Sequence, residues 1–316
     1  MKITTLIPAF KPQYLHDLLV ALRHQTVRPE RIIISDDSPD RAFRAAFESE
    51  PLRSQIADMN IEVIDGPRAG GIANCQHLLK AWNGSTPLAH LLFDDDVIYP
   101  DFYSFHAAVH ATGAFDCSVS RRWTAIESGQ PIGQLMRPDV VVQNQQRVLS
   151  LPADAAFMST IPGCNNWLGE FSNAVFNQDG AKLLFDAKLA GISYEGLGDI
   201  GLFLAASLNK PLCYINDPLG YFRLSSQQIS QQTSSHAGKL AVLAWAALAI
   251  AGCRVDKLSR EQAVQCFRNV DALIALRNPG DADMAAFRTL MQELAGQVPS
   301  AEERFVQAWH AFIPVA

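Results

Sequence analysis

Three consecutive aspartates, Asp94, Asp95 and Asp96, directly follow the apolar run at residues 88–93. Crowded carboxylates repel one another, and a nearby cation relieves the cost of ionising them. Mg²⁺ and Mn²⁺ prefer carboxylate oxygens and commonly share their coordination sphere with substrate phosphates. The triplet therefore predicts a site for a divalent metal and a phosphate ligand, with a solvated acidic turn as the alternative.

A second acidic pair, Asp36 and Asp37, follows the apolar run at residues 31–35 and precedes Ser38. Aspartate and serine at a strand end commonly form a turn or cap a helix, which is the simpler explanation of this pair taken alone. If both acidic clusters lie on one sheet edge, one carboxylate could accept hydrogen bonds from the base or ribose of a ligand while another holds the metal.

A glycine-containing segment, residues 66–74, connects a third apolar run to a helical pattern. Within it, Arg68 precedes Gly70 and Gly71, and free backbone N–H groups at the start of a helix bind anions. An arginine at this position adds a charged donor for a phosphate. The alternative is a flexible connection without a ligand.

These motifs lie at the ends of predicted strands. Apolar runs alternate with segments in which apolar residues recur at helical spacing, an order typical of βαβ units on a parallel sheet. Strands are predicted at residues 3–8, 31–35, 61–64 and 88–93, and helices at 14–24 and 72–82. Because ligands of open α/β sheets bind outside the carboxyl ends of the strands, we expect the three motifs to share one site.

The rest of the chain divides into an irregular part and a helical part. Glycines and prolines interrupt residues 113–162, which we expect to form a substrate-facing excursion without long elements. Further along, helices are predicted at 177–189 and 200–208, a strand at 212–215, and helices from residue 239 onward, with breaks at 277–280 and near Pro299.

Composition indicates a globular chain, either one large domain or a domain with an appendage. The 316 residues are 48% hydrophobic and 18% charged, which suffices for a substantial core. A net charge of −6 and a pI near 5.7 argue against a nucleic-acid partner and leave room for a local basic pocket. The six cysteines form no CxxC pair, so neither a zinc site nor a disulfide framework is expected.

Two apolar segments bear on localisation. The run at residues 3–8 is too short for a secretory signal, so a cytoplasmic protein is expected. The alanine-rich run at 240–253 falls short of the roughly 20 residues that cross a bilayer. It predicts a core-facing helix, whose apolar face could instead pair with a second subunit or touch the inner face of a membrane.

Four motifs in this order resemble those of the family 2 glycosyltransferases: Leu6-Ile7-Pro8-Ala9-Phe10, Ile34-Ser35-Asp36-Asp37-Ser38, Arg68-Ala69-Gly70-Gly71 with Asn74, and Phe93-Asp94-Asp95-Asp96-Val97. The resemblance covers the first third of the chain and, more thinly, the part up to Phe222. It implies a GT-A fold, a Rossmann-like α/β/α sandwich with a mostly parallel central sheet that binds a nucleotide sugar. The catalytic domain would span residues 1–236, with a donor half at 1–112 and an acceptor half at 113–236, and a helical region would follow at 237–316.

The resemblance also implies roles for single residues. Asp94 and Asp96 match the ends of the family's DxD motif, with Asp96 as the main metal ligand and Asp94 nearer the ribose or a metal-bound water. Asp95, between them, is a strand-end neighbour at the donor. The other residues expected at the nucleotide are Pro8, Ala9, Asp36, Asp37, Arg68 and Asn74. The metal, Mn²⁺ or Mg²⁺, would neutralise the diphosphate and stabilise the leaving group.

Asp199 aligns with the aspartate that serves as general base in inverting members of the family. In the family an acidic residue precedes this aspartate, whereas Gly198 precedes it here, so Glu195 is a rival for the role. A carboxylate within hydrogen-bond reach of an acceptor hydroxyl could accept its proton during in-line attack at the anomeric carbon. The alternative is that Asp199 only caps the following helix.

The segment at residues 162–170 is a candidate acceptor site. Asn165 or Asn166 could recognise sugar hydroxyls, and Trp167 could stack on the apolar face of a sugar. Packing of Trp167 in the core is the alternative.

Several basic residues are candidates for contacts with phosphate. Arg223 or His236 could close over the diphosphate, as a segment after the sheet does in related enzymes, although a histidine in a polar loop is more often solvated. Arg121 and Arg122 could contact a phosphate or an anionic acceptor, with a solvated basic pair as the alternative.

The leading hypothesis is a metal-dependent, inverting enzyme that transfers a sugar from a nucleotide diphosphate donor, most simply a UDP-sugar, to a glycan or lipid-linked saccharide acceptor. The chain lacks the QxxRW signature of processive family members. A nucleotidyltransferase is one alternative, although Phe10-Lys11-Pro12-Gln13 contains no glycine where that class has a glycine-rich loop. A non-catalytic protein that binds sugar nucleotides or glycans is the other, and Gly198 keeps it open.

Overall fold

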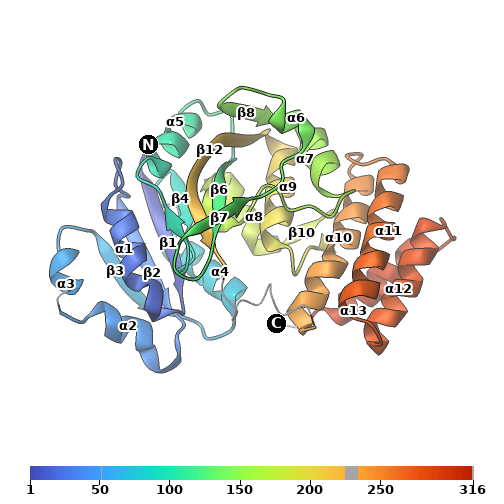
Figure 1. The fold of residues 1–316 in the computed structure, drawn as a ribbon, viewed down its shortest axis with the longest axis horizontal. Helices are drawn as coiled ribbons and strands as arrows, with labels where there is room; N and C mark the ends of the chain where they lie inside the picture. Colours follow the sequence, from blue (N-terminus) through green and yellow to red (C-terminus); the bar gives the residue numbers. More distant parts are fainter. Residues whose placement is uncertain (51, 225–233, 315–316) are drawn as a thin grey trace.

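The computed structural model describes residues 1–50, 52–224 and 234–314. Within these residues a mixed sheet of ten strands forms the centre of the molecule, with helices on both of its faces (Figure 1). The C-terminal helices lie to one side of this sandwich, at the red end of the colour bar.

The N-terminal part of the sheet consists of β1 (Ile3–Ala9), β2 (Arg31–Asp36), β3 (Ile61–Asp65) and β4 (Leu88–Leu91). These strands run parallel in the order β3-β2-β1-β4. The four predicted strands are confirmed, with ends that differ by one or two residues. Because parallel strands end on one edge, the segments that follow these strands meet there.

The second part of the sheet contains strands that are far apart in the sequence. The order continues from β4 through β9 (Ala174–Asn177), β6 (Cys117–Ala125) and β12 (Leu212–Arg223) to β5 (Val97–Ile98). The short β9 is antiparallel to both of its neighbours, whereas β6 and β12 are parallel. Outside this path, β7 (Pro131–Gln134) pairs with β6 and β8 (Val148–Leu151) pairs with β12.

The prediction that residues 113–162 contain no long element is wrong, because β6 is a central strand. The sequence of β6 lacks the apolar run that would have indicated a buried strand, because Ser118 and Ser120 occupy buried positions. Partners elsewhere in the fold satisfy the hydroxyl groups of these two serines. Ser118 contacts the rings of His106 and His110, and Ser120 contacts the carbonyl of Asn173. Hydrogen bonding makes the burial of such polar side chains possible.

Helices cover both faces of the sheet. One face carries α4 (Gly71–Trp82), α8 (Gln178–Asp186) and α9 (Gly198–Asn209), and the other carries α1 (Leu15–Arg23), α2 (Ala42–Phe47) and α5 (Phe102–His110). Along β2, Ile33 belongs to the first apolar core while Ile32 and Ile34 belong to the second. The predicted α/β/α sandwich is therefore confirmed, because its strands are buried on both sides.

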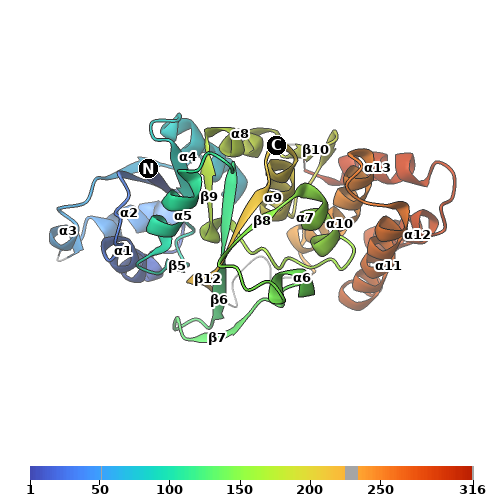
Figure 2. The same ribbon diagram turned by 90° about the horizontal axis from the view of Figure 1, so that it is seen from above.

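Shorter elements connect these layers. They are η1 (Pro12–Tyr14), η2 (Pro39–Arg41), α3 (Leu52–Gln55), α6 (Asp139–Val142), α7 (Ala153–Thr160), η3 (Phe171–Asn173), β10 (Lys188–Leu189) and β11 (Ile192–Ser193). The β7 hairpin projects away from the body of the molecule when the fold is seen from above (Figure 2).

Four helices form the C-terminal region: α10 (His236–Arg254), α11 (Arg260–Arg277), α12 (Ala282–Ala295) and α13 (Ala301–Phe312). Both predicted breaks are confirmed. By length and composition alone α10 could span a membrane, but 72% of its apolar window is buried inside the protein, as expected for a core helix. The apolar residues of α10 belong to the same core as α9, and the indole of Trp309 donates to the carbonyl of Ser193 at 2.8 Å.

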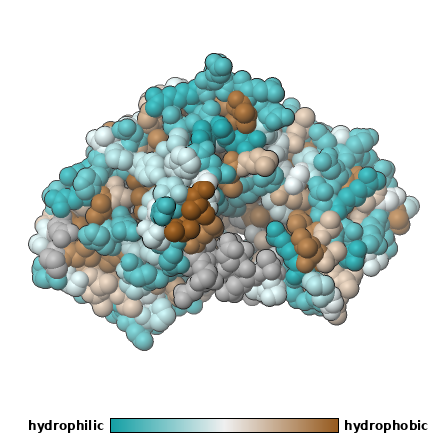
Figure 3. Space-filling model, viewed as in Figure 1, coloured by the Kyte–Doolittle hydropathy of each residue, from teal (hydrophilic) through white to brown (hydrophobic). Residues whose placement is uncertain are grey.

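The surface on the face of Figure 1 is mostly hydrophilic, and its apolar side chains form small separate patches (Figure 3). The apolar face predicted for the segment at 240–253 packs on the protein itself, since Val242, Leu243, Ala246 and Ile250 are all buried. Pairing with a second subunit and contact with a membrane remain predictions.

Candidate active site

The aspartate triplet lies at the carboxyl edge of the sheet, between the loops that follow β1 and β4. The Oδ2 atom of Asp94 accepts hydrogen bonds from the backbone N–H groups of Phe10 and Lys11, both at 2.5 Å. Burial, and then the charge of Asp95, raises the pKa of Asp94 to about 7. The Asp95 carboxylate forms an ion pair with the Lys11 ammonium group. The loop after β1 is thus attached to the triplet through both backbone and side chain.

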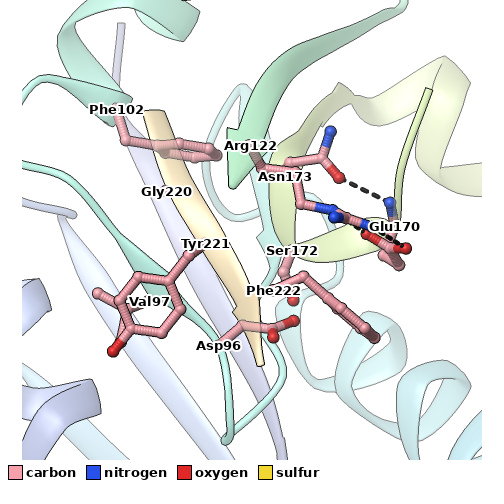
Figure 4. A pocket seen from close by; sticks show the side chains of 10 residues that line it. All are labelled: Asp96, Val97, Phe102, Arg122, Glu170, Ser172, Asn173, Gly220, Tyr221 and Phe222. Atoms are coloured by element: carbon pink, nitrogen blue, oxygen red, sulfur yellow. Dashed lines mark hydrogen bonds and ion pairs between the residues drawn. The ribbon is translucent and has the colours of Figure 1, made fainter. Parts of the chain in front are cut away.

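Asp96 points into a small pocket at the same edge (Figure 4). Its Oδ1 atom accepts a hydrogen bond from the backbone N–H of Arg223 at 3.1 Å, and its side chain is hydrogen-bonded to Ser172. Burial and the neighbouring Asp95 charge raise the pKa of Asp96 well above its usual range. Ionisation of Asp96 is therefore unfavourable until a cation approaches.

Asp94 and Asp96 fit a hard divalent cation in donor chemistry. Both are crowded carboxylates whose ionised forms are destabilised, which is the condition that a bound cation relieves. Among residues 1–50, 52–224 and 234–314, no cluster of three or more His, Cys, Asp or Glu side chains is arranged to hold a metal. Two carboxylates alone would leave coordination positions for water and for diphosphate oxygens, as is usual for Mg²⁺.

Asp199 lies in the first turn of helix α9, near the side chains of Arg122 and Glu170. Its Oδ1 atom accepts from the backbone N–H of Ile200 at 2.8 Å, and the amide of Asn166 lies 3.5 Å from its Oδ2 atom. Burial of the carboxyl group, followed by the charge of Glu170, raises the pKa of Asp199 to about 7. Glu195 is partly buried and burial raises its pKa as well, but its carboxylate makes no hydrogen bond within the described part of the chain. Near neutral pH, Asp199 can both accept and release a proton.

A partly buried ion pair that the sequence did not indicate lies between the triplet and Asp199. The guanidinium group of Arg122 forms two hydrogen bonds with the carboxylate of Glu170 and lies 4.7 Å from the centre of the Phe222 ring (Figure 4). The Glu170 charge contributes to the raised pKa values of both Asp96 and Asp199. This pair connects the two halves of the site electrostatically.

The carboxyl edge therefore combines a crowded carboxylate cluster with a carboxyl group that titrates near neutrality.

No protein-family model and no curated protein matches the chain by sequence. Solved structures do match it: S. aureus TarS 1-349 in complex with UDP-GlcNAc has a TM-score of 0.56 at 13% identity, over 98% of this chain and 92% of that chain. The mannosyltransferase PcManGT from Pyrobaculum calidifontis, in complex with GDP-Man and Mn²⁺, has a TM-score of 0.50 at 12% identity, over 98% and 85%. The chain has the GT-A glycosyltransferase fold.

The predicted donor residues of this GT-A fold surround the ends of β1 and β2. Asp37 is partly exposed, and its Oδ1 atom accepts from the backbone N–H of Arg68 at 2.5 Å. A Cβ atom at position 66 would lie 2.6 Å from the same oxygen, so glycine is required for this approach. Pro8 and Ala9 are buried at the end of β1, whereas Phe10 beside them is 55% exposed. Phe10 is thus an exposed aromatic surface at the carboxyl edge of the sheet, and the sequence did not single it out.

Two of the residues predicted to bind the donor are buried and form hydrogen bonds within the fold. The Asp36 carboxylate accepts from the backbone N–H groups of Ser38 and Arg44 and is 2% exposed, so its oxygens are engaged within the fold, and its contact with a ligand stays a prediction. Asn74 is also buried, and its Nδ2 atom donates to the carbonyl of Ser35 at 3.2 Å. Both side chains hold the end of β2 that presents Asp37.

Two further candidate residues, Trp167 and Arg223, are buried. Trp167 is 2% exposed, packs against Tyr214 and donates to the hydroxyl of Ser159, as expected for the alternative in which it packs in the core. Arg223 is 1% exposed and bonds to the carbonyl of Asp95 and to the Asp17 carboxylate, so it braces the triplet rather than closing over a diphosphate. Most of the polar run that precedes His236 lies outside the described residues; His236 itself is exposed at the start of α10.

Proposed function

We propose that this protein is a metal-dependent, inverting glycosyltransferase that transfers a sugar from a nucleotide diphosphate donor, most simply a UDP-sugar, to a hydroxyl group of a glycan or lipid-linked saccharide. The observation that carries the proposal is the shared edge: Asp94 and Asp96 stand at the end of β4, and Asp199 lies beyond the Arg122–Glu170 pair. The folds solved with UDP-GlcNAc and with GDP-Man and Mn²⁺ support a nucleotide-sugar donor.

The donor half would hold the nucleotide through its loop ends. Asp37, with the backbone of Arg68 fixed against it, offers acceptor oxygens to a base or ribose, and the exposed ring of Phe10 offers a surface for the base. Asp94 and Asp96 would hold Mn²⁺ or Mg²⁺, which as a Lewis acid supplies charge neutralisation at the diphosphate.

The acceptor half would supply the base. An ionised Asp199 accepts the proton of the acceptor hydroxyl while the oxygen attacks the anomeric carbon from the side opposite the leaving diphosphate. Asn166, next to Asp199, is placed to orient the carboxylate or a sugar hydroxyl. In-line displacement by one nucleophile inverts the configuration of the transferred sugar.

Donor turnover and donor binding test this proposal directly. We expect Mn²⁺-dependent hydrolysis of at least one donor from a panel of UDP- and GDP-sugars, and metal-dependent nucleotide binding by calorimetry. Asp96→Asn should weaken metal-dependent binding at least tenfold because it removes a charged ligand. Asp179→Asn is the matched control, since Asp179 is exposed and forms a surface ion pair with Lys182 on α8.

The non-catalytic alternative gives a different result in the same experiments. A protein that only binds sugar nucleotides would show metal-dependent binding without hydrolysis or transfer. In such a protein Asp199→Asn would leave the binding affinity unchanged. If no nucleotide sugar binds in the presence of Mn²⁺ or Mg²⁺, both the enzyme and the binding protein are excluded.

A further inference from the structure

A second pocket, with basic walls, lies next to the proposed active site. Its walls come from β6, β12 and the segments after β7 and α7, and its main lining side chains are Arg121, Arg122, Gln134, Arg137, Trp167 and Tyr214. Arg122 also lines the pocket that contains Asp96. The two pockets therefore share one wall, and the proposed reaction assigns no role to the basic one.

The positive charge of this pocket is not balanced within the described part of the chain. Arg122 has the carboxylate of Glu170 as its partner, but Arg121 and Arg137 form no ion pair there. The nearby Asp217 carboxylate is paired with Arg147 on the outside of the protein. Burial and the neighbouring Arg137 charge lower the pKa of Arg121, and the Asp217 charge offsets part of this effect. The two guanidinium groups thus lie close together with no carboxylate in direct contact among the described residues, a costly arrangement in a partly buried place.

Amide oxygens, rather than carboxylates, accept the hydrogen bonds of Arg121 and Arg137. The Nη1 atom of Arg121 donates to the carbonyl of Asn216 at 3.2 Å, and the Nη1 atom of Arg137 donates to the Oδ1 atom of Asn216 at 2.6 Å. A further donor of Arg121 contacts the amide oxygen of Gln134, while its Nε atom is buried without a partner in the described part of the chain. Neutral amides orient the two guanidinium groups but supply no negative charge of their own.

The pocket is connected to the proposed base by three consecutive residues. Asn165 donates to the carbonyl of Met136, next to Arg137, at 3.4 Å. Asn166 contacts Asp199, and Trp167 lines the pocket. A group bound between the arginines would therefore hold the rest of the same molecule near the carboxylate of Asp199.

We propose that this pocket binds the phosphate group of a phosphorylated acceptor saccharide and so positions a neighbouring hydroxyl for attack. A phosphate accepts bidentate hydrogen bonds from guanidinium groups and supplies the missing negative charge. The inference rests on the proposed function, because it specifies the acceptor class of the same site.

Binding of matched small saccharides tests the pocket. Glucose 6-phosphate, glucose and glucuronate are titrated into the full chain with UDP and Mn²⁺ at saturating concentration, so that the donor site is blocked. We expect glucose 6-phosphate to bind at least tenfold more tightly than glucose, with an affinity that falls as salt is raised. Glucuronate carries a carboxylate in place of the phosphate and should bind more weakly than glucose 6-phosphate.

Substitution of the pocket arginines tests whether the preference for glucose 6-phosphate over glucose arises in the pocket. Arg121→Gln with Arg137→Gln should reduce the ratio between glucose 6-phosphate and glucose to about one, with Arg137→Gln alone as the milder variant if the double variant is unstable. Arg288→Gln is the matched control, because Arg288 is on α12 and pairs with Asp271. A ratio near one in the unmodified protein, or a ratio that the arginine substitutions leave unchanged, would overturn the proposal.

Two other results distinguish a failure of the phosphate assignment from a failure of the proposed function. Equal affinities for glucuronate and glucose 6-phosphate would overturn the assignment to phosphate. If UDP and Mn²⁺ do not bind, the proposed function fails, yet the titrations without UDP still report on the arginine pocket.

Discussion

The pH dependence of transfer is the most direct test of the role assigned to Asp199. As a general base, Asp199 acts only when ionised, and burial together with the Glu170 charge raises its pKa to about 7. The ionised fraction increases as the pH rises through that value, so the rate constant of transfer should increase from acid to neutral pH. An aspartate with an ordinary pKa of about 4 would be ionised throughout this range and would give a flat profile.

The size of the effect follows from the pKa. With a value near 7, about a tenth of the Asp199 carboxyl groups are ionised at pH 6, half at pH 7 and about nine-tenths at pH 8. The kcat should therefore rise roughly tenfold between pH 6 and pH 8. Glu170→Gln removes the negative charge that contributes to the raised pKa, so the midpoint of its profile should move to lower pH.

The assay is transfer or donor hydrolysis at saturating donor and Mn²⁺, so that the carboxylates proposed to hold the metal should stay ionised across the pH range. Asp199→Asn should lower kcat by about 10²–10⁴, the usual contribution of a general base, while donor affinity is retained. Glu195→Gln is the matched comparison and should keep both the rate and the profile. A flat profile in the unmodified protein, or an Asp199→Asn variant of full activity, would refute the reasoning.

Three further predictions concern stability and packing. Gly196→Ala should lower the melting temperature by more than Gly191→Ala does: both positions have positive φ, but only at Gly196 would a Cβ atom lie 2.6 Å from the backbone of α10. Burial holds the pKa of His106 well below its usual value. Because the unfolded chain binds this proton more readily, the free energy of unfolding should fall as the pH drops below about 6.5. In thermal melts, His106→Gln should make this pH dependence flatter. The thiol sulfurs of Cys164 and Cys266 lie 3.7 Å apart, so diamide should cross-link this pair first, and mass spectrometry showing another pair first would contradict the packing of α11.

Local patterns in the sequence were sufficient for the N-terminal half of the sheet. Strands β1, β2 and β3 are short apolar runs separated by helical spacing, and this alternation is a property of neighbouring residues. The position of Asp94 and Asp96 followed in the same way, because a carboxylate that comes directly after a buried parallel strand must lie on the carboxyl edge. The helical C-terminal region and its breaks were also visible in the periodicity.

Only the tertiary structure decided which side chains complete the site. Arg122 and Glu170 are far apart in the sequence and meet because β6 lies beside β9 in the sheet, while Trp167 and Arg223 are buried by partners from other segments. The sequence by itself determined where the aspartate triplet stands, since local periodicity sets the end of a strand. What surrounds the triplet depends on pairing between distant strands and on burial, and these arise only when the whole chain packs.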